Sequence, residues 1–177
     1  MWNSAGTAGL ALGAVSAAYL FAGQLLAGNL EPAALWQQVT AFFLWVVKLG
    51  ACIWLMKFFM TKFACENAIT DNRIVFRMGM TTALLSALMY SAIYLANMLY
   101  ISADFYEQTF QAAIEQMKPT LDSNSLAMTE RLIGNLPKIM FFYNLTYCTI
   151  FGTVLSAIIS RTIVAREESS KNEQDEL

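Results

Sequence analysis

One lysine lies alone in the apolar part of this sequence. Lys48 stands in a long uncharged stretch, nine residues before Lys57, which corresponds to roughly 13–14 Å of helix. The stretches predicted below to cross a membrane contain no Asp or Glu that would neutralise it. Such a cation extends to the membrane surface, contacts a phosphate or another anionic group, or takes part in an ion relay. Because relays usually need carboxylates or histidines, the first two roles are favoured.

Polar side chains at helical spacing accompany this lysine. A row in the third apolar stretch repeats every three or four residues, and a similar row of Thr and Ser lies in the fourth. Such side chains usually hydrogen-bond between helices or to their own backbone, and a ligand site is the alternative. The site for a ligand or a lipid headgroup that the sequence indicates consists of Lys48, Ser86, Tyr90, Tyr94 and Asn97.

The sequence offers little that supports catalysis. It contains no histidine, which removes the commonest general base and the commonest metal ligand. Its three cysteines, Cys52, Cys65 and Cys148, are widely spaced and form no CxxC pair. No nucleophile–histidine pair, GxSxG elbow or phosphate-binding glycine loop occurs. We therefore expect a protein that is not an enzyme and that uses no cofactor and no metal.

The composition is that of a membrane protein. Of 177 residues, 57% are hydrophobic and only 14% are charged, whereas an average soluble domain has about 25% charged residues. Residues 1–30, 32–47, 78–103 and 139–160 contain no charge at all. The net charge of −2 argues against nucleic acid as a partner. A soluble enzyme, a disordered chain and a nucleic-acid binder are therefore excluded.

Apolar runs of this length predict four transmembrane helices, at residues 5–27, 34–56, 78–101 and 139–160. Pro32 and Pro137 suit the first turns of the second and fourth helices, with Asn135 as the cap of the fourth. The predicted fold class is all-α, a polytopic membrane protein with its transmembrane domain in residues 1–165. A short polar tail, 166–177, is expected to extend the last helix briefly and then fray.

The polar segment 102–138 is too long for a simple turn. Apolar residues from Tyr106 to Met117 recur at helical spacing, and Lys118-Pro119 is expected to end that helix. Asp122 to Ser125 predicts a turn with a helix cap, and a second amphipathic stretch then runs into the fourth membrane helix. We expect an outer helical hairpin between membrane helices three and four.

Basic residues predict the orientation of the helices. Seven Lys and Arg lie between the second and third helices or in the tail, against three in the segment 102–138. Because Lys and Arg favour the cytoplasmic side, both the N-terminus and the C-terminus are predicted to be cytoplasmic.

Small residues predict close helix packing. Ala5, Gly9, Gly13 and Ala17 recur every four residues along the first helix, and Gly152 and Ser156 mark the fourth. Such strips let helix backbones approach closely, either between two copies of the chain or inside its own bundle. The second arrangement is the commoner one and is favoured here.

The order of these features resembles domain-of-unknown-function family 4199, small bacterial membrane proteins with four predicted spans. The resemblance covers nearly the whole chain through its hydropathy and scattered residues. The stretches that carry it are GLALGAVSAAYL, WLMKFFMTKF, FRMGMTTALLSALMYSAIYLANMLYISADFYEQ and NLPKIMFFYNLTYCTIFGTVLSAIISRTIVAR. It implies a protein of the bacterial inner membrane, encoded in some cases beside polyprenyl-phosphate glycosyltransferases, and it carries over no functional residue.

Two functions remain open from the sequence. The first is a non-enzymatic accessory or scaffold protein that anchors a membrane-associated partner, such as the glycosyltransferase that the resemblance implies. The alternative is a small carrier or flippase for a lipid-linked or other anionic substrate. Four helices are few for a monomeric transporter, so that function favours a homo-oligomer. Membrane lipids are expected partners in both cases.

Overall fold

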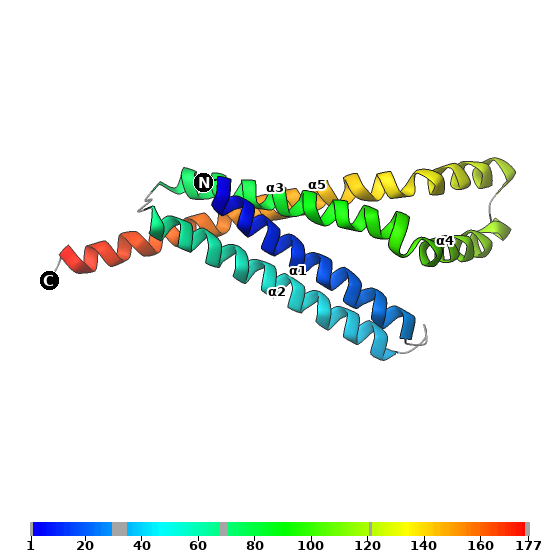
Figure 1. The fold of residues 1–177 in the computed structure, drawn as a ribbon, viewed down its shortest axis with the longest axis horizontal. Coiled ribbons are helices and arrows are strands. Elements are labelled where there is room, and N and C mark those ends of the chain that lie inside the picture. The colour runs from blue at the N-terminus through cyan, green and yellow to red at the C-terminus, as the bar shows by residue number, and fades with distance from the viewer. Residues whose placement is uncertain (1, 30–34, 68–70, 121, 176–177) are drawn as a thin grey trace. The chain divides into compact units, whose positions relative to one another are not determined.

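The computed structural model describes residues 2–29, 35–67, 71–120 and 122–175, and every element of secondary structure among them is a helix (Figure 1). The elements are α1 (Trp2–Asn29), α2 (Leu35–Glu66), α3 (Asn72–Ala96), the π-helical turn η1 (Asn97–Ile101), α4 (Ala103–Met117), the 3-10 turn η2 (Lys118–Thr120) and α5 (Ser123–Asp175). The predicted all-α class is confirmed. The turn predicted around Pro32 lies outside the described residues.

Four helical segments are long and apolar enough to cross a membrane, in the predicted number and order. They are Trp2–Leu25, Phe42–Glu66, Asn72–Ile101 and Arg131–Ile163. The helices themselves extend beyond the predicted spans, and α2 continues past residue 56 to Glu66. Lysine and methionine are good helix formers, so the helix does not stop where the sequence becomes charged.

The chain divides into two compact units. The first contains Met1–Tyr90 and Leu145–Leu177, and the second contains Ser91–Asn144. We call them the bundle unit and the junction unit. The bundle unit has an apolar core to which α1, α2, α3 and α5 contribute residues such as Leu12, Met60, Met78 and Ile159.

Small residues bring the helices of the bundle unit close together. A Cβ atom built on Gly9 would lie 2.8 Å from the Cβ of Leu85 on α3, and one on Gly13 would lie 2.8 Å from the sulfur of Met89. The strip that contains Ala5, Gly9, Gly13 and Ala17 is buried along α1. Gly9 and Gly13 therefore pack against α3 of the same chain.

The packing residues expected on the last helix also face α3. A Cβ atom on Gly152 would lie 2.5 Å from the Cβ of Ala83. Ser156 is fully buried, and its hydroxyl donates a 2.7 Å hydrogen bond to the carbonyl of Gly152. Because the hydroxyl of Ser156 forms its hydrogen bond within its own helix, the side chain packs in a close helix contact without leaving its polar atom unpaired.

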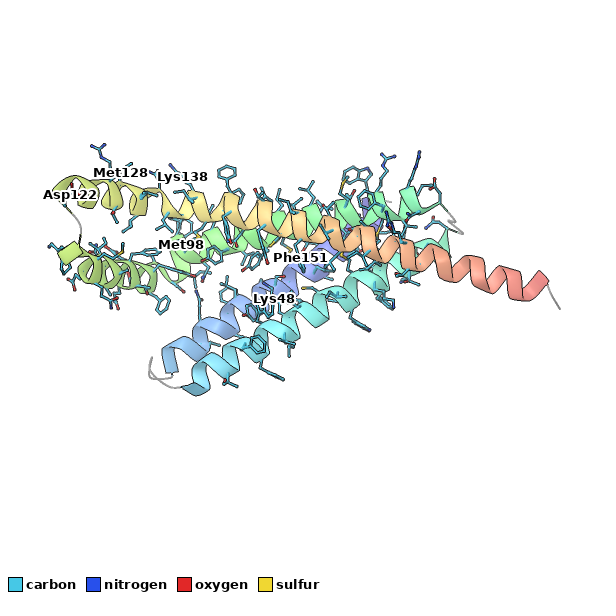
Figure 2. All side chains as sticks on the ribbon, turned by 180° about the vertical axis from the view of Figure 1, so that it is seen from behind. Lys48, Met98, Asp122, Met128, Lys138 and Phe151 are labelled. Atoms are coloured by element: carbon cyan, nitrogen blue, oxygen red, sulfur yellow. The ribbon has the colours of Figure 1, made fainter. Side chains whose placement is uncertain are left out.

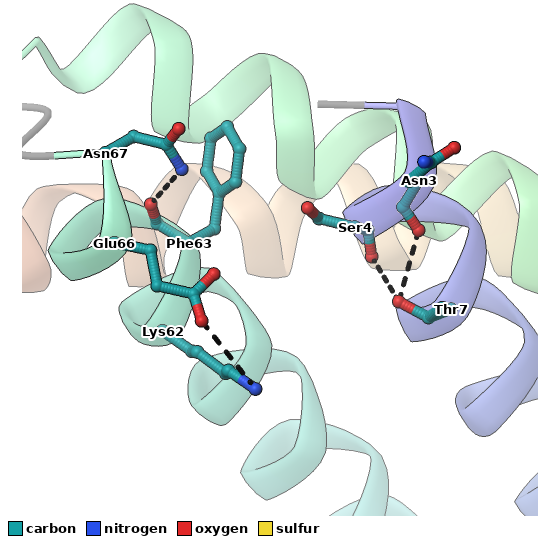
Figure 3. A network of polar contacts seen from close by, with 7 residues as sticks. All are labelled: Asn3, Ser4, Thr7, Lys62, Phe63, Glu66 and Asn67. Carbon is teal, nitrogen blue, oxygen red and sulfur yellow. Dashed lines mark hydrogen bonds and ion pairs between the residues drawn. The ribbon is translucent and has the colours of Figure 1, made fainter.

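One end of the bundle unit is polar. There Lys62 and Glu66 of α2 form a 3.8 Å ion pair, and Figure 3 shows them beside the beginning of α1. Ser4 and Thr7 of α1 line a shallow pocket together with this pair. The Thr7 hydroxyl is within 3.2 Å of the carbonyl of Asn3 and donates to it. Polar groups at a helix end are what a boundary between lipid and water requires.

A buried amide organises the junction unit. Asn97 is fully buried at the start of the π-helical turn that ends α3. Its Nδ2 donates to the hydroxyl of Tyr106 at 3.4 Å, and its Oδ1 accepts from the hydroxyl of Ser102 at 3.3 Å. These bonds hold the first turns of α4 against the end of α3.

Helix α4 ends as predicted, at Met117, and the 3-10 turn that follows contains Pro119. None of the residues of α4 is fully buried, but Tyr106, Phe110 and Ile114 of its apolar stripe are half-buried. The outer helical hairpin stays a prediction.

Helix α5 corrects the prediction that Asn135 and Pro137 open the fourth membrane helix. The helix is continuous from Ser123 to Asp175, and Pro137 lies in its interior. Asn135 caps nothing, because its Nδ2 donates to the carbonyl of Arg131 at 3.1 Å within the helix. The amphipathic stretch before Pro137 is already helical, so the proline costs the hydrogen bond to the carbonyl of Ile133 without ending the helix.

The tail prediction also changes. The backbone remains helical through residues 166–175, where the sequence led us to expect fraying. No Gly or Pro interrupts the sequence between Arg161 and Asp175, and its Glu, Lys, Arg and Gln are strong helix formers.

Candidate anion site at Lys48

The ammonium group of Lys48 lies between two tyrosine rings. Its Nζ atom is 4.8 Å from the ring centroid of Tyr19 on α1 and 4.8 Å from that of Tyr90 on α3. Both distances are within the roughly 6 Å over which a cation is attracted to an aromatic face. The side chain thus turns toward α1 and α3 and does not run along the outside of α2 to the membrane surface.

A cavity of about 120 Å³ adjoins Lys48 inside the bundle unit. A single water molecule needs roughly 10–15 Å³ of such space, so the cavity accommodates a polar group of several heavy atoms. Its walls come from all four long helices of the unit. The lining residues that carry polar atoms include Ser16, Lys48, Cys52, Ser86, Tyr90 and Cys148.

The charge in the described lining of the cavity is positive. Lys48 is its only charged lining residue among those that the structure describes. Leu12, Met56 and Leu155 make much of the remaining wall apolar. Ser16 Oγ and Cys52 Sγ lie 4.0 Å apart, within hydrogen-bonding reach for sulfur. A positive charge with hydroxyl groups in apolar surroundings is suited to binding an anion.

The structure brings together three of the five residues of the predicted ligand site. Lys48, Ser86 and Tyr90 line the same cavity. Tyr94 and Asn97 belong to the junction unit, where the ring centroids of Tyr94 and Tyr106 are 6.3 Å apart. Neither Tyr94 nor Asn97 is among the residues that line the cavity.

Sequence reasoning missed Tyr19 and Ser16. Both lie on α1, three residues apart, and therefore share a helix face. This spacing was a signal that polar groups accompany the small strip of α1. Nothing in the spacing indicates, however, that the same face meets Lys48 of α2.

Two cysteines line the cavity together with Lys48. Cys52 and Cys148 are free thiols, and the described residues contain no cluster of three or more Cys, Asp or Glu side chains placed to hold a metal ion. Figure 2 shows Lys48 on α2 and Phe151 on α5, two residues of the same cavity wall. The fold and the site define a helical protein with four potential membrane spans and a cationic cavity.

No family model matches the chain, and no curated protein or solved structure matches it either. The resemblance to family 4199 therefore stays a prediction.

Proposed function

We propose that the chain is a multi-pass protein of a bacterial cytoplasmic membrane that binds a lipid-borne anionic group at Lys48 and holds it for a membrane-associated partner. In this proposal the protein is an accessory protein and not an enzyme, and both of its termini are cytoplasmic. The resemblance to family 4199 makes a polyprenyl-phosphate glycosyltransferase the partner to test first.

The placement of Lys48 carries the proposal. Its ammonium group lies at a cavity formed by four apolar helices, and the predicted spans contain no Asp or Glu. A charge in the middle of a membrane is costly and usually marks a functional site. Since the spans supply no anion, a bound group is the available source of a counter-charge, and a lipid phosphate is the most abundant anion in a membrane.

Exposed apolar side chains support the placement in a membrane. Phe42 and Trp54 of α2 are each 65% exposed, and Phe142 of α5 is 64% exposed. They belong to long rows of exposed large hydrophobic residues on these two helices. In water such rows would drive aggregation, whereas hydrocarbon chains cover them at no cost.

The competing explanation gives Lys48 a purely structural role. The two tyrosine rings already attract the ammonium group, so the side chain is partly stabilised without any ligand. An aromatic face does not replace a hydrogen-bond acceptor, however. A phosphate oxygen adds charge-assisted hydrogen bonds of about 1.5–3 kcal/mol each.

The first prediction tests this proposal by lipid mass spectrometry on protein purified from native membranes. Lys48→Leu is expected to lose a co-purifying anionic lipid, because removal of one charged contact lowers affinity roughly tenfold to a hundredfold. Lys48→Arg keeps the charge and should retain most of that lipid. Lys57→Leu is the matched control, since Lys57 is an exposed lysine on the same helix that does not line the cavity.

The same preparations also separate the two roles. A stoichiometric enzyme partner that co-purifies with the wild type supports the accessory role. Movement of lipid between leaflets that depends on Lys48, without such a partner, supports the carrier instead. Identical lipid content in the wild type and all three variants would leave Lys48 as a structural residue and refute the proposed function.

A further inference from the structure

The wall of the Lys48 cavity has a buried side and an exposed side. The residues from α1 and α3 are buried or half-buried, and Leu12, Ala83 and Ala87 are at most 6% exposed. The exposed members are Trp45 of α2 and Tyr147 and Phe151 of α5. The cavity therefore opens to the outside between α2 and α5, with its floor on α1 and α3.

Aromatic rings flank this opening on both helices. On α2, Phe42 and Trp45 stack with their ring centroids 6.1 Å apart. On α5, Tyr147 and Phe151 stack with their ring centroids 6.3 Å apart and their planes inclined by only 11°. We call these four residues the aromatic mouth. Trp45, Tyr147 and Phe151 line the cavity together with Lys48, and Phe42 extends the apolar surface through its contact with Trp45.

An aromatic opening with a cation beside it has a definite chemical preference. A free inorganic anion would have to lose its water to pass apolar rings, which is strongly unfavourable. A lipid brings its own hydrocarbon chain to cover the rings, while its charged headgroup reaches the cation. The arrangement thus matches an amphiphile with one anionic end.

We propose that an anionic membrane lipid enters sideways between α2 and α5, with its headgroup at Lys48 and one hydrocarbon chain along the aromatic mouth. This inference rests on the proposed function, to which it adds the route and the position of the chain. It predicts that the ligand is a lipid with a phosphate headgroup and not a free phosphate.

The second prediction uses tryptophan fluorescence in phosphatidylcholine vesicles that contain a small fraction of phosphatidic acid with brominated chains. A variant in which Trp2, Trp36 and Trp54 are replaced by Phe reports from Trp45 alone. Bromine quenches a nearby indole, so brominated phosphatidic acid is expected to quench Trp45 several times more strongly than the same amount of brominated phosphatidylcholine. Lys48→Leu should abolish this difference, and Lys48→Arg should keep it.

A variant that keeps only Trp54 is the matched control. Trp54 is on the same helix and is exposed, but it does not line the cavity, so both brominated lipids should quench it equally. Inorganic phosphate added at the same concentration should leave the quenching of Trp45 unchanged; displacement of the lipid by phosphate would overturn the choice of a lipid. The melting temperature of each variant confirms that it is folded.

Two results would overturn the inference and are distinguishable. Equal quenching of Trp45 by both lipids, while Lys48 still retains an anionic lipid in purified protein, refutes the sideways route and leaves the proposed function intact. Equal quenching together with loss of that Lys48-dependent lipid refutes both.

Discussion

The cost of placing the Lys48 charge in a membrane is similar to the stabilisation that its two tyrosine contacts provide. A measurement of protein stability alone therefore does not show whether a ligand is bound at Lys48. A lysine at the centre of a membrane helix costs about 2.5–3.5 kcal/mol on insertion scales. Contacts with two aromatic faces return about 0.5–2 kcal/mol each, and both tyrosines lie at 4.8 Å. The combined return of about 1–4 kcal/mol is of the same order as the cost. Lys48→Leu is therefore expected to change the melting temperature little, and lipid content is the informative measurement.

Asp122 provides a charge-dependent contact outside the apolar spans. Its carboxylate accepts the backbone N–H of Ser125 at 3.0 Å, which confirms the cap predicted before α5. Hydrogen bonds from the side chain and the backbone of Ser125 lower the pKa of the Asp122 carboxyl. Because the folded pKa lies below the unfolded pKa of about 3.9, the cap stabilises the helix above that pH. Its contribution is lost as the pH falls through the folded pKa.

The third prediction follows from the lowered pKa of the Asp122 carboxyl. Hydrogen exchange at the Ser125 amide should be slow near neutral pH and should lose its protection at a pH below about 4, after correction for intrinsic rates. Asp122→Asn keeps an acceptor but does not titrate, so its protection should not depend on pH in this way. Asp122→Ala should expose the amide at every pH. Protection that is the same in the wild type and in Asp122→Ala would show that the cap has no role.

At the scale of helices, hydropathy predicts that a transmembrane helix is present far better than it predicts the residues at which the helix begins and ends. The four spans were predictable because an apolar run of about 20 residues has few other stable structures. The break at Pro137 was predicted wrongly, because the sequence does not show that the helix beginning at Ser123 is already formed when it reaches the proline. Local signals for helix starts are reliable only where no earlier helix is present.

The candidate site also contains residues that the sequence predicts and residues that it does not. Lys48 was predictable as a lone charge in an apolar run, and Ser86 was predictable at a similar depth. Tyr19 was not, because its contact with Lys48 depends on which faces of α1 and α2 meet. Helix packing sets that choice, and no periodicity along one helix encodes it.

The fourth prediction concerns the contact between α3 and α5. In Gly152→Ala the new methyl group would lie 2.5 Å from the Cβ of Ala83, and neither side chain is flexible, so the two helices have to move apart. Overpacking of this kind typically costs about 1–3 kcal/mol. Unfolding in mixed micelles, followed by circular dichroism, should show that loss of stability.

Gly50→Ala is the control for that measurement. A Cβ atom on Gly50 meets nothing within 4 Å, and alanine improves helix propensity by about 0.5–1 kcal/mol. Gly50→Ala should therefore leave the protein as stable as before or slightly more stable. If Gly152→Ala behaved in the same way, the close approach of α3 and α5 would be contradicted.

At the scale of the whole molecule, the distribution of charge is the property that relates the fold to a membrane. In the bundle unit, Lys62 and Glu66 lie at the polar end, and Lys48 is the charge that the described apolar middle contains. Basic residues near the ends of spans remain on the cytoplasmic side during insertion. The polar end of the bundle unit is therefore expected to face the cytoplasm. A lipid headgroup that binds at Lys48 has to move from the membrane surface to a depth of about half the membrane thickness.

The fifth prediction tests that orientation with a reporter that is active only in the cytoplasm. Fusion after Arg77 or at the C-terminus should give activity, because seven basic residues lie on that side, whereas insertion next to Ser123 should give none. A reporter that is active only outside the cytoplasm should give the reverse pattern and serves as the control. The bias of seven basic residues against three is large enough to fix one orientation. Cytoplasmic activity at Ser123 would invert the protein and place the polar end of the bundle unit outside.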